Sequence, residues 1–428
     1  MAMKIRLLLV LTFMAAVASP LRAQQHRTAL FVGNSYTAVN NLPQMVADVA
    51  ASMGDELSFR SNTPGGCTFQ QHCTNQSMQL INQGAWDVVV LQEQSQLPSF
   101  PQNQVEQEVF PFARRLVDSA YAANPCVEPM FYMTWGRKNG DAGNAPSFPV
   151  LGTYEGMDSM LCLRYTYMAD VNDASLCPVG RVWRTLRQQH PQIELYQSDE
   201  SHPSVAGTYA AACAFYVMLF HRDPMLITYD GGLAVEVAET IRSVVYEVVY
   251  NHLSQWQRPK PMADFTFDSV STTVIRFTSR ATHAAYTHWS FGDGDTLTTT
   301  DMVLTHNYPD SGSYQVMQTA WRHCMSDTAI QSVLIRRATP VAAPTIDDAT
   351  LSLFPNPAND GVEVSFPSGF LSDGTVNVDL IAADGRRIST TTATTNRIRI
   401  DLSGLTTQWG IIRVVTSSEC YSKKIVKQ

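Results

Sequence analysis

The feature that most constrains the fold is an alternation of short apolar segments and helical segments between residues 28 and 256. The segment Trp86–Leu91 (WDVVVL) contains three successive valines, as is typical of a strand covered by helices on both faces. Further strands are expected at Thr28–Val32, Glu56–Arg60, Pro129–Trp135 and Ile193–Gln197, and helices at Leu42–Met53, Val105–Ala123, Val179–Gln189, Ser204–Phe220 and Leu233–Trp256. This order predicts an α/β domain at residues 26–257, with a parallel sheet between two layers of helices.

The sequence changes character after residue 257. The segment Arg258–Pro261 (RPKP) is expected to be a linker. Residues 262–337 are rich in Thr, Ser and Val, alternate with a period of two, and contain turn signals such as Gly292–Gly294 (GDG). A second linker, Ala338–Asp348, precedes the same alternation in residues 349–428. The chain is therefore expected to continue with two all-β, immunoglobulin-like sandwich modules.

The first 23 residues have the pattern of a secretory signal peptide. Lys4 and Arg6 precede the apolar run Leu7–Val17, and Ala23 offers a small residue at a cleavage site. The run is too short to cross a bilayer, which takes about 20 apolar residues, and no later segment is long enough either. We therefore expect an exported chain with no membrane span.

The charge of the chain argues against polyanionic partners. The formal net charge is −8, or −11 without the first 23 residues, and only 16% of the residues are charged. A chain this acidic is a poor binder of nucleic acid or of an anionic membrane surface. The 45% of hydrophobic residues suffices for packed cores and excludes a disordered chain.

An exported chain can form disulfides, and this one has eight cysteines. Six of them lie in the first half of the chain, and the sequence leaves their pairing open. Their short loops make Cys67–Cys73 and Cys162–Cys177 the expected pairs, whereas Cys213 is expected to be a buried apolar residue. Neither a CxxC pair nor an HExxH helix occurs, so we expect neither a metal nor another cofactor.

Two short motifs at expected strand ends carry candidate catalytic residues. Gly33–Thr37 (GNSYT) follows the first strand, which would place Ser35 at the carboxyl edge of the sheet, next to a helix N-terminus. Asp199–Pro203 (DESHP) follows the last expected strand of the domain. In that loop His202 can take the proton of a serine while Asp199 fixes the tautomer of the imidazole. Each motif alone is also common as a turn or helix cap, but together they predict a Ser-His-Asp triad if the two loops meet.

The two motifs and several phrases between them resemble the SGNH (GDSL-like) hydrolases, most closely a secreted branch of that superfamily. The phrases are WDVVVLQEQS at 86–95, YMTWGR at 132–137, PVG at 178–180 and the stretch 196–209, so the similarity covers about residues 28–225. The resemblance implies a flavodoxin-like α/β/α sandwich and a serine esterase or acylhydrolase. Ser35 would be the nucleophile, His202 the general base and Asp199 its partner. No GxSxG elbow occurs, which argues against the α/β-hydrolase fold.

The same resemblance implies an oxyanion hole. One donor would be the backbone N–H of Ser35 itself, and the second block of the family supplies a glycine, which falls at Gly65–Gly66 with Gly66 preferred. The third block usually reads Gly-x-Asn-Asp, whereas this chain has Gln92–Ser95 (QEQS). Gln94 aligns with the asparagine and keeps an amide donor on a side chain that is one methylene longer.

Other residues near the expected site have two interpretations. Trp135 and Arg137 end a strand at the same edge and are candidates to line a pocket, although a Trp is also a common core residue. His72 follows the glycine pair and is expected to orient that loop. The Gly- and Pro-rich segment Arg137–Gly156 predicts a long surface loop near the site.

The two β-modules also resemble known families. WSFGDG at 289–294, with Tyr308 and Tyr314, resembles the PKD repeat, which implies a spacer or a module that binds a polysaccharide or protein surface. LSLFPNPA at 351–358, the segment Asp379–Arg386 and the ending KKIVKQ resemble the C-terminal sorting domain of type IX secretion, although Trp409–Ile412 departs from its usual pattern. This resemblance implies that the outer-membrane secretion machinery of a Gram-negative bacterium is a partner, and that the protein is extracellular or on the cell surface.

The expected function is a secreted serine esterase that works through an acyl-enzyme, with an acylated carbohydrate as the candidate substrate. A lipase- or thioesterase-like activity on the same triad is one alternative. The other alternative, kept open by Gln94, is a surface adhesin or glycan-binding protein without catalysis.

Overall fold

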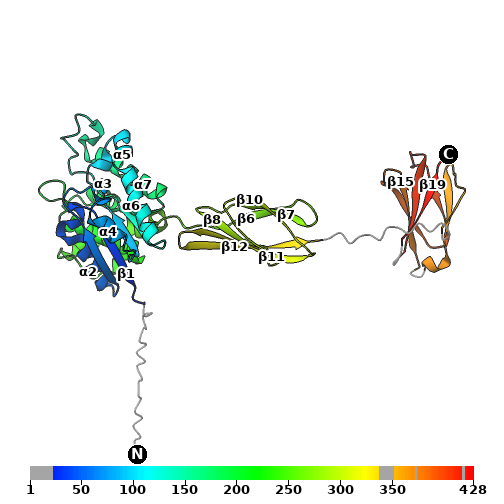
Figure 1. Cartoon of the computed structure of the whole chain (residues 1–428), viewed down its shortest axis with the longest axis horizontal. Coiled ribbons are helices and arrows are strands. Elements are labelled where there is room, and N and C mark those ends of the chain that lie inside the picture. Colours follow the sequence, from blue (N-terminus) through cyan, green and yellow to red (C-terminus); the bar gives the residue numbers. More distant parts are fainter. Residues whose placement is uncertain (1–22, 337–350, 372–373, 417–419) are drawn as a thin grey trace, which may run out of the picture. The chain divides into compact units, whose positions relative to one another are not determined.

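The computed structural model describes residues 23–336, 351–371, 374–416 and 420–428. The expected signal peptide, apart from Ala23, and the expected linker Ala338–Asp348 lie outside these residues. Along the described chain, an α/β domain comes first and antiparallel all-β sheets follow (Figure 1).

Five parallel strands form the sheet of the α/β domain. They are β1 (His26–Val32), β2 (Glu56–Asn62), β3 (Val88–Leu91), β4 (Glu128–Tyr132) and β5 (Ser175–Cys177). Their order is β2-β1-β3-β4-β5, and Ala29 of β1 pairs with Phe59 on one side and Val88 on the other. This is the flavodoxin-like order, so the expected fold class is confirmed. In this topology ligands bind beyond the carboxyl ends of the strands.

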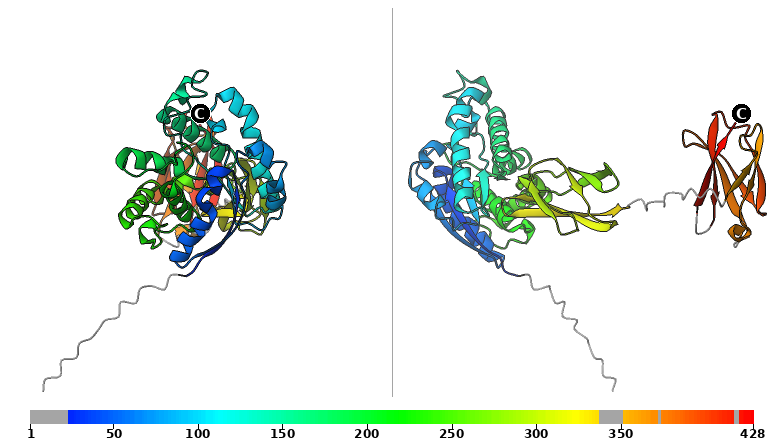
Figure 2. Two further views of the ribbon diagram at one scale, coloured as in Figure 1. Left: turned by 90° about the vertical axis from the view of Figure 1, so that its left-hand side faces the viewer. Right: turned by 45° about the vertical axis from the view of Figure 1, so that its right-hand side comes forward.

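Helices cover both faces of the sheet (Figure 2). The helices are α1 (Ser35–Ala38), α2 (Leu42–Ser52), α3 (Phe69–His72), α4 (Gln76–Ile81), α5 (Gln102–Glu108), α6 (Phe110–Ala123), α7 (Tyr154–Val171), α8 (Val179–Gln189), α9 (Val205–Phe220), α10 (Val235–Val248) and α11 (Leu253–Trp256). Short 3-10 turns of this domain lie at Val39–Asn41 (η1), Leu97–Ser99 (η2), Pro149–Gly152 (η3), Pro224–Leu226 (η4) and Tyr250–His252 (η5), and a further one, Ser368–Leu371 (η6), lies in the C-terminal module. Because successive strand residues point to opposite faces, Phe31 of β1 belongs to the core under α2, α8, α9 and α10, whereas Leu30 belongs to the core under α6 and α7.

Helix α9 anchors the loop that carries His202. Residues 205–220 contain no charged side chain, and all of them except Val205 are buried. The Ser204 hydroxyl accepts the Gly207 N–H at 3.1 Å and so caps the helix, and His221 ends it with a left-handed φ of 54°. The helix therefore begins three residues after His202 and fixes the position of that residue.

Two strand predictions in this domain need correction. The expected strand Ile193–Gln197 is absent, since this segment forms only an isolated bridge between Tyr196 and Pro203. Its apolar side chains pack into the core under α9 instead, with Leu195 only 1% exposed. The fifth strand is Ser175–Cys177, which is too short to be recognised from its pattern. An apolar run alone does not distinguish a strand from a buried loop.

Three further predictions need correction. The expected helix Leu233–Trp256 is divided into α10, η5 and α11. The expected helix Val105–Ala123 is broken at Val109 into α5 and α6, because Pro111 near the start of α6 lacks an N–H. The irregular segment that was expected to reach Gly156 ends at Thr153, whose hydroxyl caps the long helix α7 by accepting the Gly156 N–H at 3.1 Å. Helix α7 was missed because its apolar residues do not form a clear stripe.

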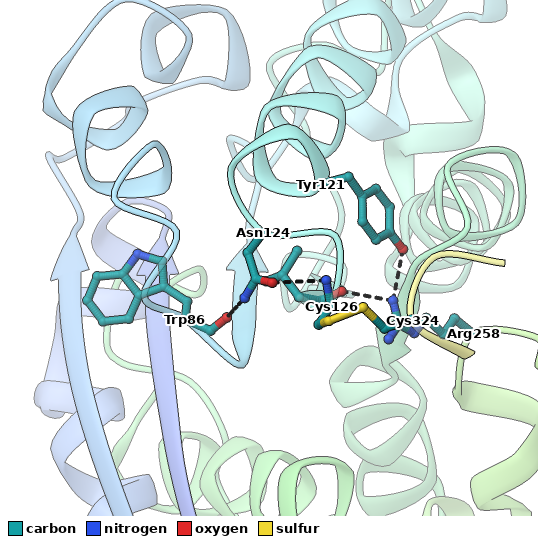
Figure 3. The surroundings of a disulfide bond; sticks show 7 residues. Trp86, Tyr121, Asn124, Cys126, Arg258 and Cys324 are labelled. Atoms are coloured by element: carbon teal, nitrogen blue, oxygen red, sulfur yellow. Dashed lines mark hydrogen bonds between the residues drawn. A yellow bond between two sulfur atoms is a disulfide. The ribbon is translucent and has the colours of Figure 1, made fainter. Parts of the chain in front are cut away.

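The observed disulfide joins Cys126 to Cys324, which lie 198 residues apart in the chain (Figure 3). Cys126 lies in the turn after α6. There the Asn124 side chain accepts the Cys126 N–H at 2.9 Å and donates to the Trp86 carbonyl at 3.1 Å. Cys324 lies between two strands of the following β-module. The expected pairs are wrong, and the four cysteines concerned are all free thiols: Cys67, Cys73, Cys162 and Cys177.

Residues 265–335 form two antiparallel sheets, ordered β10-β7-β6 and β12-β11-β8-β9. The strands are β6 (Phe265–Ser269), β7 (Val274–Ser279), β8 (Tyr286–Ser290), β9 (Thr296–Thr299), β10 (Val303–Asn307), β11 (Gly312–Arg322) and β12 (Met325–Ile335). The ring of Trp289 is buried and lies 5.1 Å from Phe265 and 5.6 Å from Phe277. The tryptophan of the WSFGDG motif is therefore a core residue.

The C-terminal module, residues 351–428, has a core of its own. Its two antiparallel sheets are ordered β13-β14-β17 and β16-β15-β18-β19. The strands are β13 (Ser352–Phe354), β14 (Gly361–Ser365), β15 (Val376–Ala382), β16 (Arg387–Ala393), β17 (Arg397–Asp401), β18 (Trp409–Val415) and β19 (Cys420–Val426). Alternate residues such as Val362, Val378 and Ile412 are fully buried, as the period of two predicts.

Candidate active site

The candidate nucleophile lies just beyond the carboxyl end of β1. Ser35 is half-buried and begins the short helix α1, and the preceding residue, Asn34, caps it by accepting the Tyr36 N–H at 3.1 Å. The chain turns sharply at Gly33, where a Cβ would lie 2.7 Å from the side-chain oxygen of Gln92. Glycine is needed there because a neighbouring side chain occupies that space. The motif thus lifts the serine out of the strand onto the edge of the sheet.

The structure brings His202 to this serine. His202 Nε2 lies 2.8 Å from Ser35 Oγ, and His202 Nδ1 is hydrogen-bonded to the carboxylate of Asp199. The other carboxylate oxygen of Asp199 accepts the backbone N–H of His202 at 3.0 Å and of Ser201 at 3.1 Å. Since a carboxylate can only accept, Nδ1 carries the proton and Nε2 is free to accept one from the serine.

The Asp199 carboxylate stays ionised to a lower pH than an ordinary aspartate. Its slight burial alone would raise its pKa, but hydrogen bonds from the side chain and backbone of His202 outweigh this effect and lower the pKa. The side chains are open to solvent, 46% exposed for Asp199 and 30% for His202. The three residues therefore form an open, charge-assisted chain at the rim of the sheet.

Two backbone N–H groups at this rim are available to a ligand. Among the described hydrogen bonds, neither Ser35 nor Gly66 uses its N–H as a donor to another residue. Gly66 has a φ of +67°, a conformation that side-chain-bearing residues rarely adopt, and a Cβ there would touch nothing within 4 Å. Free N–H groups that lie near a nucleophile can stabilise an oxyanion.

Gln94 follows β3 at the same edge, and its amide is partly used by the protein. The side-chain oxygen accepts the N–H groups of Gln96 at 2.8 Å and Leu97 at 3.1 Å, at the start of η2. The side-chain nitrogen makes only long contacts, 3.5 Å to Ser95 Oγ and 3.3 Å to Gln96 Oε1. The amide end that remains for a ligand is therefore the N–H donor.

The two candidate pocket residues differ in their surroundings. Trp135 is fully buried, so it is a core residue and does not line an open pocket. Its ring stacks between Tyr36 and Trp183, with centroids at 4.9 and 3.7 Å, and its N–H donates to the Ser201 carbonyl at 3.1 Å. Arg137 is partly exposed, and its guanidinium lies 3.5 Å from the carboxylate of Asp141 in the long loop.

His72 was expected to orient the loop of the glycine pair, and its side chain instead contacts the turn before Ser35. It is fully buried, its Nε2 lies 2.9 Å from the Gly33 carbonyl and its Nδ1 lies 2.8 Å from Ser77 Oγ. Burial lowers the pKa of His72, and because a carbonyl only accepts, Nε2–H is the donor. His72 therefore fixes the turn before Ser35 through its hydrogen bond to the Gly33 carbonyl.

Sequence reasoning missed several residues that support the site. Gln92 accepts the Asn34 N–H and the Thr37 hydroxyl, both at 2.9 Å, and donates to Asn34 Oδ1 at 3.0 Å. The Tyr36 hydroxyl lies 2.6 Å from Ser201 Oγ and so joins the nucleophile turn to the histidine loop. Gln92 and Tyr36 lie inside the motifs at 86–95 and 33–37, and this was the only sequence feature that could have indicated their role. Among the described residues, no group of three metal-binding side chains surrounds Ser35 and His202.

Family comparisons identify the two β-modules. Residues 265–334 match the PKD domain family, and residues 352–428 match the secretion system C-terminal sorting domain family. The sorting domain indicates that the chain is a secreted or cell-surface protein and that the secretion machinery takes part in its export. Within the part of the chain that the structure describes, no helix is long and apolar enough to cross a membrane.

Solved structures similar to this chain include proteins related to each part. A DUF4886 family protein from Bacteroides uniformis has 16% identity over 53% of this chain and 95% of its own, with a TM-score of 0.46. A candidate GDSL-like lipase from Parabacteroides merdae has 13% identity over 45% of this chain and 95% of its own, with a TM-score of 0.34. The PKD1 domain of the Vibrio cholerae metalloprotease PrtV has 25% identity over 18% of this chain and 100% of its own, with a TM-score of 0.17.

These likenesses carry no argument about activity, since every TM-score is below 0.5. A search of curated proteins found no match to the chain. The case for a function therefore rests on the side-chain geometry of the α/β domain.

Proposed function

We propose that residues 26–257 form a serine hydrolase domain that cleaves esters through an acyl-enzyme, followed by a PKD-like module at 262–337 and a sorting module at 349–428. The observation that carries the proposal is the 2.8 Å contact between Ser35 Oγ and His202 Nε2, with Asp199 on the other ring nitrogen. A nucleophile, a base and an orienting carboxylate in hydrogen-bond reach are the signature of nucleophilic acyl transfer.

The reaction follows from the positions of these groups. Ser35 Oγ attacks the ester carbonyl carbon while His202 Nε2 takes its proton, and the N–H groups of Ser35 and Gly66 with the amide of Gln94 hold the oxyanion. Collapse of the intermediate breaks the ester bond, and the leaving alcohol takes the proton from His202. Water then attacks the acyl-enzyme while His202 Nε2 takes its proton. Collapse of this second intermediate breaks the bond between the acyl group and Ser35 Oγ and releases the acid, and His202 returns the proton to Ser35 Oγ.

The openness of the site favours a short acyl group on a polar carrier. With 46% of Asp199 and 30% of His202 exposed, the triad lies on the surface rather than at the bottom of an apolar tunnel. A long acyl chain would gain little burial there, because binding of an apolar chain scales with the apolar area removed from water. We therefore propose an O-acetylated carbohydrate as the substrate class.

A panel of nitrophenyl esters with acetyl, butyryl and octanoyl groups tests the proposal on the secreted, oxidised protein. We expect the highest kcat/KM for acetyl, labelling by a fluorophosphonate probe, and loss of both in Ser35→Ala. The matched control is Ser119→Ala, a partly exposed serine on α6 whose hydroxyl donates to the carbonyl of Arg115 in its own helix. Rates that rise with chain length would indicate a lipase- or thioesterase-like enzyme, and wild-type protein that neither labels nor hydrolyses would indicate an adhesin.

A further inference from the structure

A buried carboxyl group lies directly behind the proposed oxyanion hole. Glu93 follows β3 between Gln92 and Gln94, and it is fully buried. Its two carboxyl oxygens accept the Phe69 N–H at 2.9 and 3.1 Å, and one of them also accepts the Gln94 N–H at 2.6 Å. Phe69 begins α3, three residues after Gly66, whereas Gln94 belongs to the loop after β3. One side chain thus ties together the two loops that would supply the second and third oxyanion donors.

The nucleophile turn joins the same network. Asn34 Nδ2 donates to the Cys67 carbonyl at 3.1 Å and to the Glu93 carbonyl at 3.4 Å. The Glu93 N–H in turn donates to the hydroxyl of Tyr165 on α7 at 3.2 Å. All three segments that carry Ser35, Gly66 and Gln94 therefore converge on Asn34 and Glu93. None of the described contacts of the Glu93 carboxyl involves Ser35 or His202.

Keeping this acid in the interior is unfavourable unless its hydrogen bonds compensate. Burial raises the pKa of Glu93 to about 8, while the N–H groups of Gln94 and Phe69 act in the opposite direction. The ionisable groups that face it are the Tyr165 hydroxyl and the Cys67 and Cys73 thiols. Tyrosine and cysteine side chains are either neutral or negative, and burial raises the pKa of all three, so they stay neutral. None of them therefore brings a positive charge that would explain why an acid is placed here. Above this pKa the ionised carboxylate offers two acceptor oxygens for N–H groups of two loops.

We infer that Glu93 is a positioning residue that sets the spacing of the Gly66 and Gln94 donors around the Ser35 hydroxyl. This inference rests on the proposed function for its catalytic consequence. Replacement of Glu93 by Gln keeps the shape but leaves only one acceptor oxygen, and its amide nitrogen, a donor, would then face a backbone N–H. The loops would separate while the nucleophile and its base stay in contact.

The test compares Glu93→Gln with wild type on nitrophenyl acetate at pH 9, where Glu93 is ionised, with enzyme concentrations matched by titration of the active serine with a fluorophosphonate. We expect kcat to fall by at least about tenfold with KM within about twofold, because an oxyanion hole acts in the transition state. The matched control is Asp55→Asn, a carboxyl that is 3% exposed before β2, at the opposite end of the strands, and that pairs with Arg222. It should lower thermal stability while it leaves kcat within about twofold.

A second measurement is independent of turnover. Hydrogen–deuterium exchange should become faster in the peptides that cover residues 65–69 and 92–97 of Glu93→Gln, but not around His202. An unchanged kcat in an active wild-type background, or unchanged exchange in both loops, overturns the inference. If the wild type is inactive and unlabelled, the proposed function fails, and the exchange data alone then decide whether Glu93 holds the loops.

Discussion

Asn34 Nδ2 donates to the carbonyl oxygen of Cys67 at 3.1 Å, so the residue before the candidate nucleophile holds the loop that contains Gly66. The other end of the same amide caps α1 and accepts from Gln92 at 3.0 Å. Asn34 is only 2% exposed, and its backbone N–H and both polar atoms of its side chain are hydrogen-bonded inside the protein. Gly-Asn-Ser is a common helix-cap motif, and here the capping residue Asn34 also connects the loops that form the candidate site.

Replacement of Asn34 by Ala should destabilise the protein by about 2–4 kcal/mol, because it removes a cap and leaves buried partners unpaired. The measurement is urea denaturation of the full-length protein. A matched control is Thr153→Ala, which removes the exposed cap of α7 and should lower the free energy of unfolding by only about 1 kcal/mol. Equal losses in the two variants would contradict the scaffold role.

Gly66→Ala tests the second oxyanion donor. The φ of +67° at this residue is unfavourable for alanine, so the loop should shift and kcat on nitrophenyl acetate should fall by about 10²-fold. Gly65→Ala is the matched control, since the neighbouring glycine has no positive φ and a Cβ there also meets nothing within 4 Å. Similar kcat values for the two variants would remove Gly66 from the mechanism.

Local sequence patterns predicted the parallel sheet because short, continuous apolar segments are distinctive when both faces are covered. They also placed Ser35 and His202 at the same edge, although the strand expected before His202 does not exist. His202 reaches Ser35 because α9 and the Tyr196–Pro203 bridge hold its loop. A buried loop can end at the same edge of the sheet as a strand would. The position of His202 was therefore predicted correctly even though residues 193–197 form no strand.

Relationships across the chain could not be predicted in this way. The role of Glu93 depends on an N–H of Phe69 in another loop, and no pattern within residues 92–95 encodes that contact. The disulfide likewise depends on the meeting of a turn after α6 with a hairpin almost 200 residues later. Short cysteine spacing favours pairing only where the backbone brings the two Cβ atoms together, and the closely spaced cysteines of this chain are free thiols.

The disulfide gives a prediction that a thiol titration can check. Oxidised protein, denatured without reductant, should expose six thiols, and reduced protein eight. Pairing of Cys67 with Cys73 or of Cys162 with Cys177 in addition would leave fewer than six. Peptide mapping should recover Cys126 linked to Cys324.

The double variant Cys126→Ser/Cys324→Ser should lose about 2–5 kcal/mol of stability, because the bond closes a long loop in the unfolded chain. Arg322 and His323, beside Cys324, both contact the carboxylate of Asp173, the histidine at 3.0 Å, so the hairpin keeps polar contacts when the bond is absent. We therefore expect the variant to fold. The control is Cys162→Ser, which changes a free thiol and should alter the free energy of unfolding by no more than about 0.5 kcal/mol. An equally small loss of stability in the double variant would contradict the prediction.

The sorting module should lose stability in acid through Asp379. This carboxylate is 2% exposed and accepts from Thr390 Oγ1 at 2.6 Å and from Arg413 at 2.5 and 3.1 Å. Burial alone would raise its pKa, but these hydrogen bonds outweigh burial and lower the pKa below the ordinary value. The stabilisation is therefore complete above the aspartate pKa of the unfolded chain, about 4, and is lost as the pH falls through the lower pKa of the folded state.

Asp379→Asn should accordingly cost about 2 kcal/mol at pH 7, and the difference from wild type should shrink below about pH 4. Hydrogen–deuterium exchange in peptides that cover β15, corrected for the intrinsic pH dependence of exchange, measures this free energy in the full-length protein. Arg387→Gln is the control, because this arginine is 61% exposed and lies 3.8 Å from the carboxylate, which makes it a surface pair of at most about 0.5 kcal/mol. A difference between Asp379→Asn and wild type that stays constant from pH 7 to pH 3 would show that the charge of Asp379 does not stabilise the module.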